Sequence, residues 1–92
     1  MKYALEFSEE SQKDIQKIKK SGNKILFRKL TVLLQELMEH PTTGTGKPKQ
    51  LQHQKSSTWS RRISDKHRLV YRVQEEKVTV LILTAWGHYD DK

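Results

Sequence analysis

A seven-residue run, VTVLILT from Val78 to Thr84, constrains the fold of this chain more than any other feature. A short and nearly continuous apolar run is typical of a strand that is buried inside a sheet. Glu75, Glu76 and Lys77 precede the run and predict a tight turn. We therefore expect a central strand that is covered on both faces, around which the other elements are arranged.

Two helices are predicted before this run. The first begins after Ser8, whose side chain suits an N-cap, and it ends at Gly22. The second has a wide apolar face at helical spacing and ends near His40, because Pro41 restricts the residue before it. The leucines of that face are Leu26, Leu30, Leu33 and Leu37.

The remaining segments predict strands and a loop. Apolar residues alternate with other residues over 2–7, which favours a half-buried strand, and residues 58–64 and 67–74 form a predicted hairpin. Residues 42–49 read TTGTGKPK, a loop by its glycines and proline. The order strand, helix, helix and then three hairpin-connected strands predicts one α+β domain over residues 1–92. Its two helices pack on one face of a twisted, mostly antiparallel sheet.

Positive charge is concentrated in one part of the sequence. The chain holds 18 Lys and Arg residues against 11 Asp and Glu residues, a net charge of +7. Between Lys47 and Arg72 there are eight basic residues and one acidic residue, Asp65, so this stretch carries the whole excess. Such a concentration favours a surface that binds a polyanion, most simply a phosphate backbone. The alternative interpretation is a solvated surface that keeps the protein soluble.

The composition also excludes several classes of protein. A chain of 92 residues is long enough for one compact domain. It contains no cysteine, which rules out disulfides and any cysteine-based metal site or nucleophile. No apolar run approaches the ~20 residues of a membrane span, and the N-terminus lacks the pattern of a signal peptide. We therefore expect a cytoplasmic protein.

Two parts of the sequence carry candidate catalytic residues. The side chain of Arg68 projects from a predicted strand beside apolar residues, and a guanidinium in such a place can hold a phosphate. The alternative is an ion pair or a surface charge, which is the commoner role of a lone arginine. His88 and Tyr89 follow the predicted central strand. A histidine transfers protons near neutral pH, and a tyrosine stacks on a base or donates a hydrogen bond. The alternative for both is a frayed tail in which they are incidental.

The other histidines give weaker signals. His53 follows the basic loop and is either an RNA contact or an ordinary loop residue. No two histidines have the spacing of metal ligands with supporting acids. We therefore expect neither a metal ion nor a cofactor.

Three segments resemble the YoeB-like branch of the RelE/ParE toxin superfamily. They are GTGKPKQLQH (44–53), TWSRRISDKHRLVYRV (58–73) and GHY (87–89), and the block WSRRI-x-x-x-HRLVY is the specific part of the signal. The resemblance implies a microbial-RNase-like fold and a toxin of a type II toxin–antitoxin system. It also implies cleavage of mRNA in the ribosomal A site, in which a ribose 2′-OH attacks the neighbouring phosphorus and leaves a 2′,3′-cyclic phosphate and a 5′-OH.

The same resemblance assigns roles to individual residues. Arg68 occupies the position that stabilises the charged transition state, His88 that of the general acid, and Tyr89 that of a residue that orients the substrate. Lys49 stands where YoeB-like proteins commonly carry a glutamate as general base. The RelE branch uses lysine in this role, so Lys49 can replace the glutamate as general base. In the second alternative Lys49 only binds phosphate while His88 acts alone. In the third, Lys49 marks a weakened or inactive toxin. The residues expected to contact RNA or phosphate are Lys47, Lys49, His53, Arg61 and Arg62.

The resemblance implies partners as well. These are a cognate YefM-like antitoxin that is acidic and partly disordered, the ribosome with its mRNA, and a second copy of the chain. The alternative function is a weakened or inactive RelE-like binding module that occupies the ribosome or binds an antitoxin without cutting. ParE-like relatives act on DNA gyrase, but the HRLVY and HY positions match the RNase branch.

Overall fold

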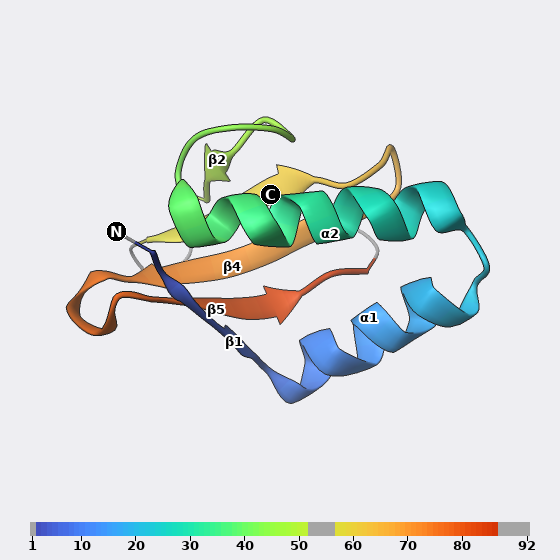
Figure 1. Cartoon of the computed structure of the whole chain (residues 1–92), viewed down its shortest axis with the longest axis horizontal. Helices are drawn as coiled ribbons and strands as arrows, with labels where there is room; N and C mark the ends of the chain where they lie inside the picture. Colours follow the sequence, from blue (N-terminus) through green and yellow to red (C-terminus); the bar gives the residue numbers. More distant parts are fainter. Residues whose placement is uncertain (1, 52–56, 87–92) are drawn as a thin grey trace.

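The computed structural model describes residues 2–51 and 57–86, in which two helices pack against one face of a five-stranded sheet (Figure 1). This arrangement confirms the predicted α+β class. Neither helix of the described part is long and apolar enough to cross a bilayer. The elements are β1 (Ala4–Phe7), α1 (Glu9–Lys20), α2 (Lys24–Glu39), β2 (Lys49–Gln50), β3 (Thr58–Arg62), β4 (Arg68–Gln74), the 3₁₀ turn η1 (Glu75–Lys77) and β5 (Thr79–Thr84).

The helices begin and end where local chemistry directs them. Ser8 caps α1 by accepting a hydrogen bond from the Ser11 amide at 3.0 Å, as predicted. Asn23 caps α2 in the same way, accepting from the Leu26 amide at 3.0 Å. The predicted leucine face of α2 is buried and forms the centre of the core, together with Ile18 of α1.

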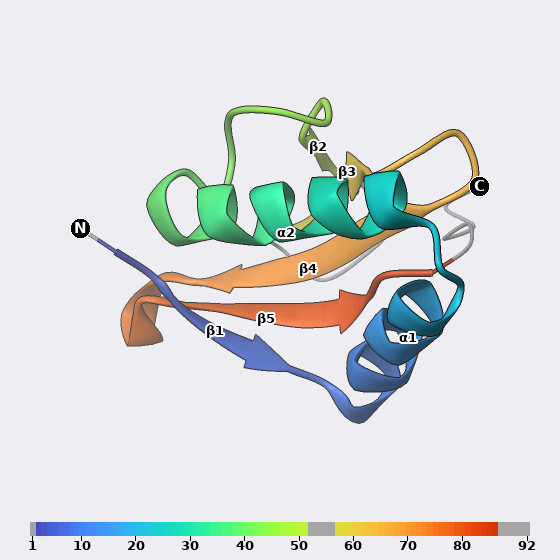
Figure 2. The ribbon, with the colours of Figure 1, turned by 45° about the vertical axis from the view of Figure 1, so that its right-hand side comes forward.

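The sheet has the strand order β1-β5-β4-β3-β2, with β1 parallel to β5 and every other pair antiparallel. The apolar run therefore lies inside the sheet between β1 and β4, as predicted (Figure 2). The expectation that it is covered on both faces is wrong. Val80 and Ile82 are buried against the helices, whereas Leu81 and Leu83 are only half-buried because both helices lie on the other side.

Strand β2 begins within the predicted loop. Lys49 pairs with Ser60 and Gln50 with Trp59, so the last residue of that loop is the first residue of an edge strand. Two residues give no alternation from which a strand can be recognised, and only the partner strand β3 reveals it.

A β-bulge interrupts the pairing of β4 with β5. Val70 pairs with Thr84 and Tyr71 with Ile82, which leaves Leu83 as an extra residue on β5. Bulges bend a strand and change the direction of the side chains that follow. Here the extra residue lies four residues before the segment 87–92, which carries the predicted residues His88 and Tyr89.

Gly46 is held tightly between α2 and β3. Its φ is +85°, and a Cβ atom placed there would lie 2.9 Å from the carbonyl oxygen of Arg62. Its own carbonyl accepts a hydrogen bond from the Arg62 amide at 2.7 Å. Gly22 has a similar φ of +77°, but a Cβ atom added there would have no neighbouring atom within 4 Å.

We predict that Gly46→Ala destabilises the protein more than Gly22→Ala does. Both variants incur a left-handed backbone strain of about 1–2 kcal/mol. Only Gly46→Ala adds a clash with a main-chain atom that cannot move without breaking a hydrogen bond. Urea denaturation followed by circular dichroism measures the two free energies of unfolding. Equal losses would show that the Arg62 main chain yields at no cost.

Candidate functional site

Four basic residues lie on the face of the sheet that is turned away from the helices, which we call the distal face. Directly paired residues of neighbouring strands have side chains on the same face. Lys49 pairs with Ser60 of β3, and Arg62 lies two residues further along β3, so their side chains share a face. Arg62 in turn pairs with Arg68 of β4. Arg72 lies four residues along β4 from Arg68 and so has its side chain on this face as well. The register thus brings the predicted residues Lys49, Arg62 and Arg68 onto one surface.

The pairing of Arg62 with Arg68 is electrostatically unfavourable. Like charges placed directly opposite each other destabilise a sheet. Among the described residues the one ion pair is that of Arg61 with Glu36, so no described carboxylate neutralises the distal face. Arg62 is exposed and Arg68 is half-buried beside the buried Val70. An anion bound between the two guanidinium groups relieves their repulsion, and a phosphate fits the planar fork of arginine.

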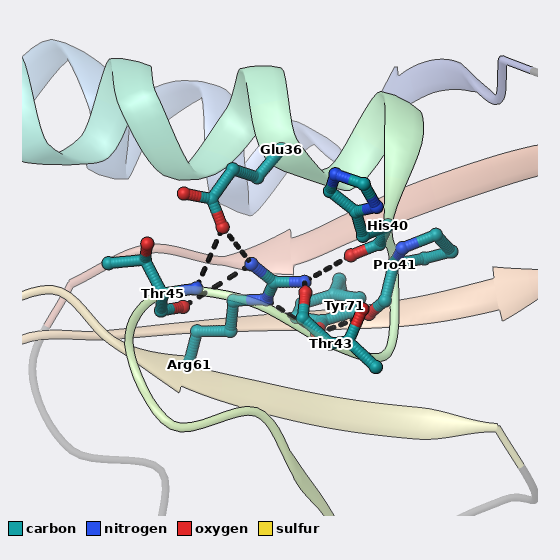
Figure 3. Close-up of polar contacts among 7 residues, drawn as sticks. All are labelled: Glu36, His40, Pro41, Thr43, Thr45, Arg61 and Tyr71. Carbon is teal, nitrogen blue, oxygen red and sulfur yellow. Dashed lines mark hydrogen bonds and ion pairs between the residues drawn. The ribbon is translucent and has the colours of Figure 1, made fainter.

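Arg61 lies on the opposite face and is completely buried (Figure 3). Its Nη1 donates to Glu36 Oε1 at 2.9 Å, and its Nε donates to the Tyr71 hydroxyl at 3.1 Å. The expectation that Arg61 contacts RNA is therefore wrong, because its guanidinium is fully occupied inside the protein. The sequence already indicated that these two residues differ, because adjacent residues of a strand have side chains on opposite faces, so Arg61 and Arg62 cannot both face RNA. The remaining acceptors of Arg61 are the main-chain oxygens of His40, Thr43 and Thr45.

Tyr71 links Arg61 and its partners, which we call the Arg61 cluster, to Pro41 at the start of the loop that precedes β2. Its hydroxyl accepts from Arg61 and donates to the carbonyl oxygen of Pro41 at 2.7 Å. The side chain is fully buried and belongs to the hydrophobic core. Burial raises the pKa of the Tyr71 hydroxyl, and the hydrogen bond and charge of Arg61 oppose that rise. Tyr71 thus stays neutral at physiological pH and keeps its proton for Pro41.

Glu36 is the anionic partner in the cluster. Hydrogen bonding to Thr45 lowers the pKa of the Glu36 carboxyl below its usual value, partial burial opposes this, and the hydrogen bond and charge of Arg61 add to the lowering. The Thr45 amide donates to Glu36 Oε1 at 2.8 Å. Glu36 therefore binds the loop and Arg61 through the same oxygen.

The end of β5 is fixed by α1. The Ala85 amide donates to the buried Asp14 carboxylate at 3.0 Å, and the Ser8 hydroxyl donates to the Leu83 carbonyl at 2.8 Å. Beyond them, the ring of Trp86 packs edge-on against His67 with centroids 4.5 Å apart. These contacts give the chain a defined exit from β5 up to the last described residue.

Several predicted site residues lie outside the described part of the chain. His53, His88 and Tyr89 belong to the segments 52–56 and 87–92. Their roles remain predictions. Lys47 is described and exposed, with a φ of +53° in the loop before β2. Within residues 2–51 and 57–86, no three His, Asp or Glu side chains come together as metal ligands.

Comparison with known proteins gives one family. A family model for the "YoeB-like toxin of bacterial type II toxin-antitoxin system" matches residues 7–89. The Toxin YoeB of Mycobacterium bovis is 50% identical over 62 residues, which cover 67% of this chain and 71% of that protein. The Toxin YoeB of Escherichia coli (strain K12) is 38% identical over 85 residues, covering 92% and 98%.

Solved structures of similar proteins share the fold. The YoeB dimer from Staphylococcus aureus has a TM-score of 0.81 at 28% identity, covering 97% of this chain and 100% of that one. The YoeB–YefM complex from Staphylococcus aureus has a TM-score of 0.78 at 29% identity with the same coverage. The fold of this chain is therefore that of known YoeB structures.

We predict that Arg61→Ala lowers the free energy of unfolding by about 3 kcal/mol or more, because it leaves buried acceptors unpaired. Arg61→Lys, which keeps the charge but loses the planar fork, gives an intermediate loss. The matched control is Arg62→Ala, which removes the neighbouring exposed charge and changes stability by less than about 0.5 kcal/mol. Urea denaturation measures all three. Equal losses for Arg61→Ala and Arg62→Ala would contradict the assignment.

The lowered pKa of Glu36 predicts acid sensitivity. A carboxyl whose pKa is lower in the folded state stabilises the protein above its unfolded value, near 4.3, and this stabilisation is lost as pH falls through the folded value. The stability difference between wild type and Glu36→Gln should therefore shrink as pH is lowered from 7 to 3. The control Glu76→Gln removes an exposed carboxyl of η1 and should follow wild type. Parallel curves for Glu36→Gln and wild type would refute this prediction.

Proposed function

The chain belongs to the YoeB-like toxins of bacterial type II toxin–antitoxin systems, and from this premise we propose that it is a ribosome-dependent endoribonuclease that cleaves mRNA in the A site. The observation that carries the proposal is the pair Arg62–Arg68 on the distal face. Two opposed guanidinium groups without a described carboxylate partner favour a phosphate ligand, and Lys49 lies on the same face.

The proposed reaction uses the substrate's own nucleophile. The ribose 2′-OH attacks the adjacent phosphorus, the bond from phosphorus to the 5′-oxygen breaks, and a 2′,3′-cyclic phosphate and a 5′-OH remain. Arg68 stabilises the negative charge that develops on the phosphoryl oxygens, which is usually the largest single catalytic contribution. His88 donates a proton to the departing 5′-oxygen, and Tyr89 orients the substrate. The nucleophile needs no metal ion for this transfer.

The destination of the 2′-OH proton depends on Lys49. The register of β2 with β3 puts Lys49 on the distal face, which supports contact between Lys49 and a phosphate or ribose bound next to Arg62 and Arg68. As general base, Lys49 accepts the 2′-OH proton in its neutral form. As a phosphate-binding residue, Lys49 remains charged, and a neutral His88 accepts the 2′-OH proton and then delivers it to the departing 5′-oxygen. The two roles predict different results for Lys49→Glu, which restores the residue common in the YoeB-like branch.

The partners are proposed from the same family. The Staphylococcus aureus relative forms a complex with YefM and is also known as a dimer. We infer that this chain binds a cognate antitoxin through an acidic segment that is disordered before binding, and that it self-associates. An acidic segment complements the cations of the distal face.

The proposal predicts that purified ribosomes programmed with a defined mRNA yield an upstream fragment ending in a 2′,3′-cyclic phosphate when wild-type protein is added. Arg68→Ala should reduce the cleavage rate by about 10²–10³-fold, since it removes the charge stabilisation. The matched control is Lys77→Ala, which removes one exposed positive charge from η1 and should cleave like wild type. Ribosome affinity should fall as salt rises, because phosphate contacts release counterions.

Other outcomes select between the candidate functions. Intact mRNA with the protein still bound to the ribosome would support the alternative, a toxin-like binding module without nuclease activity. Cleavage that is unchanged in Arg68→Ala would refute the proposed role of the distal face. Faster cleavage by Lys49→Glu supports a glutamate-type base position, whereas loss of activity supports Lys49 as the working residue.

A further inference from the structure

Strand β2 is too short to hold Lys49 in place by itself. It forms two residue pairs with β3 and lies at the edge of the sheet. Just before it, Lys47 has a φ of +53°, a left-handed conformation that persists only when the surrounding structure enforces it. The segment that carries Lys49 therefore needs support from elsewhere in the protein.

The cluster around Arg61 supplies that support from the helix side of the sheet. Thr45 is held twice, since its amide donates to Glu36 at 2.8 Å and its carbonyl accepts from Arg61 at 3.3 Å. Tyr71 holds the start of the loop through the Pro41 carbonyl at 2.7 Å. Figure 3 shows these side chains converging on the loop from α2, β3 and β4.

The loop also fits closely at its glycines. A Cβ atom at Gly44 would collide with Glu36 Oε1 and lie 3.3 Å from Arg61 Nη1, so the main chain passes directly over the ion pair. The Gly46 carbonyl then accepts from the Arg62 amide at 2.7 Å. Residues 41–46 are thus fixed to the sheet and to α2, up to three residues before Lys49.

We propose that Arg61, Tyr71 and Glu36 are positioning residues that place Lys49 over the distal face for the RNA reaction. Arg61 and Lys49 lie on opposite faces of the sheet, so the cluster acts through the loop and without touching RNA. The inference rests on the proposed function, since it assumes that Lys49 takes part in phosphate chemistry. It adds three residues of the helix side to the determinants of activity.

A double-mutant cycle separates positioning from general stability. Tyr71→Phe keeps the ring and removes the hydroxyl that joins Arg61 to Pro41. It should lower the cleavage rate at saturating ribosomes by about tenfold, because small displacements of a reacting group are costly, and should change KM little. In a Lys49→Ala background the same substitution should have less than about a twofold effect, because coupled residues are not additive.

The control is Ile18→Val, which removes one methyl group from a fully buried residue of α1. It should cost about 0.5–1.5 kcal/mol of stability. Its effect on cleavage should be small and the same with or without Lys49. If Tyr71→Phe also acts equally in both backgrounds, or if Lys49→Ala leaves cleavage unchanged, the positioning role is refuted while the nuclease proposal stands.

Amide hydrogen exchange gives a second measurement that requires no activity. In Tyr71→Phe the amides of Thr45 and Arg62 should exchange about tenfold faster than in wild type, because the loop they bind is released. The amide of Ala4 donates a hydrogen bond to the Val78 carbonyl at 2.9 Å and serves as an internal reference, whose exchange rate should not change. A wild-type protein that leaves mRNA intact would refute the proposed function and the catalytic part of the inference, and exchange would then test only whether the cluster holds the loop. Unchanged exchange at Thr45 overturns the inference.

Discussion

The burial of one guanidinium group governs how the parts of this protein fit together. Moving a charge out of water costs several kcal/mol unless an opposite charge and a full set of hydrogen bonds replace the solvent. Arg61 finds the charge on α2, in Glu36, and its other partners on β4 and along the loop before β2. These partners come from segments far apart in sequence, so the guanidinium is satisfied only when helix, sheet and loop are assembled together. The arginine therefore enforces cooperative packing around the loop.

Two consecutive arginines on β3 have opposite fates. Arg61 is paired and buried, whereas Arg62 faces Arg68 and has no described carboxylate partner. Because side chains alternate along β3, one face of the strand holds the buried Arg61, which stabilises the fold, and the other face holds Arg62, whose repulsion with Arg68 lowers stability. The unfavourable face persists because the favourable one compensates for it. The two partners proposed above, an acidic antitoxin segment and RNA phosphates, would each neutralise this excess positive charge and relieve the same repulsion.

Periodic features of the sequence predicted most of the fold. The leucine face of α2, the cap at Ser8 and the hairpin of β3 and β4 follow from local spacing and local chemistry. Features set by distant partners did not. The parallel pairing of β1 with β5 leaves no mark in either segment, and β2 is defined by β3 alone. The site shows the same division. The resemblance pointed to Arg68 through the block WSRRI-x-x-x-HRLVY and to Lys49 through the segment GTGKPKQLQH. A count of basic residues treats Arg61 like its neighbours. Strand alternation separates Arg61 from Arg62, and the packed loop shows which of the two is buried.

The parallel pairing of β1 with β5 determines when the sheet can be completed during synthesis of the chain. Ala4 pairs with Thr79, so the first strand waits for a partner synthesised 75 residues later. At the usual pace of translation this is a delay of roughly 4 to 15 seconds. During that time α1 and α2 leave the ribosome with their apolar faces uncovered, and β4 lacks the neighbour that will flank it. The distal face is carried by β2, β3 and β4, but the sheet that supports it is complete only after β5 has been synthesised, so each new molecule lacks the assembled surface for most of its synthesis.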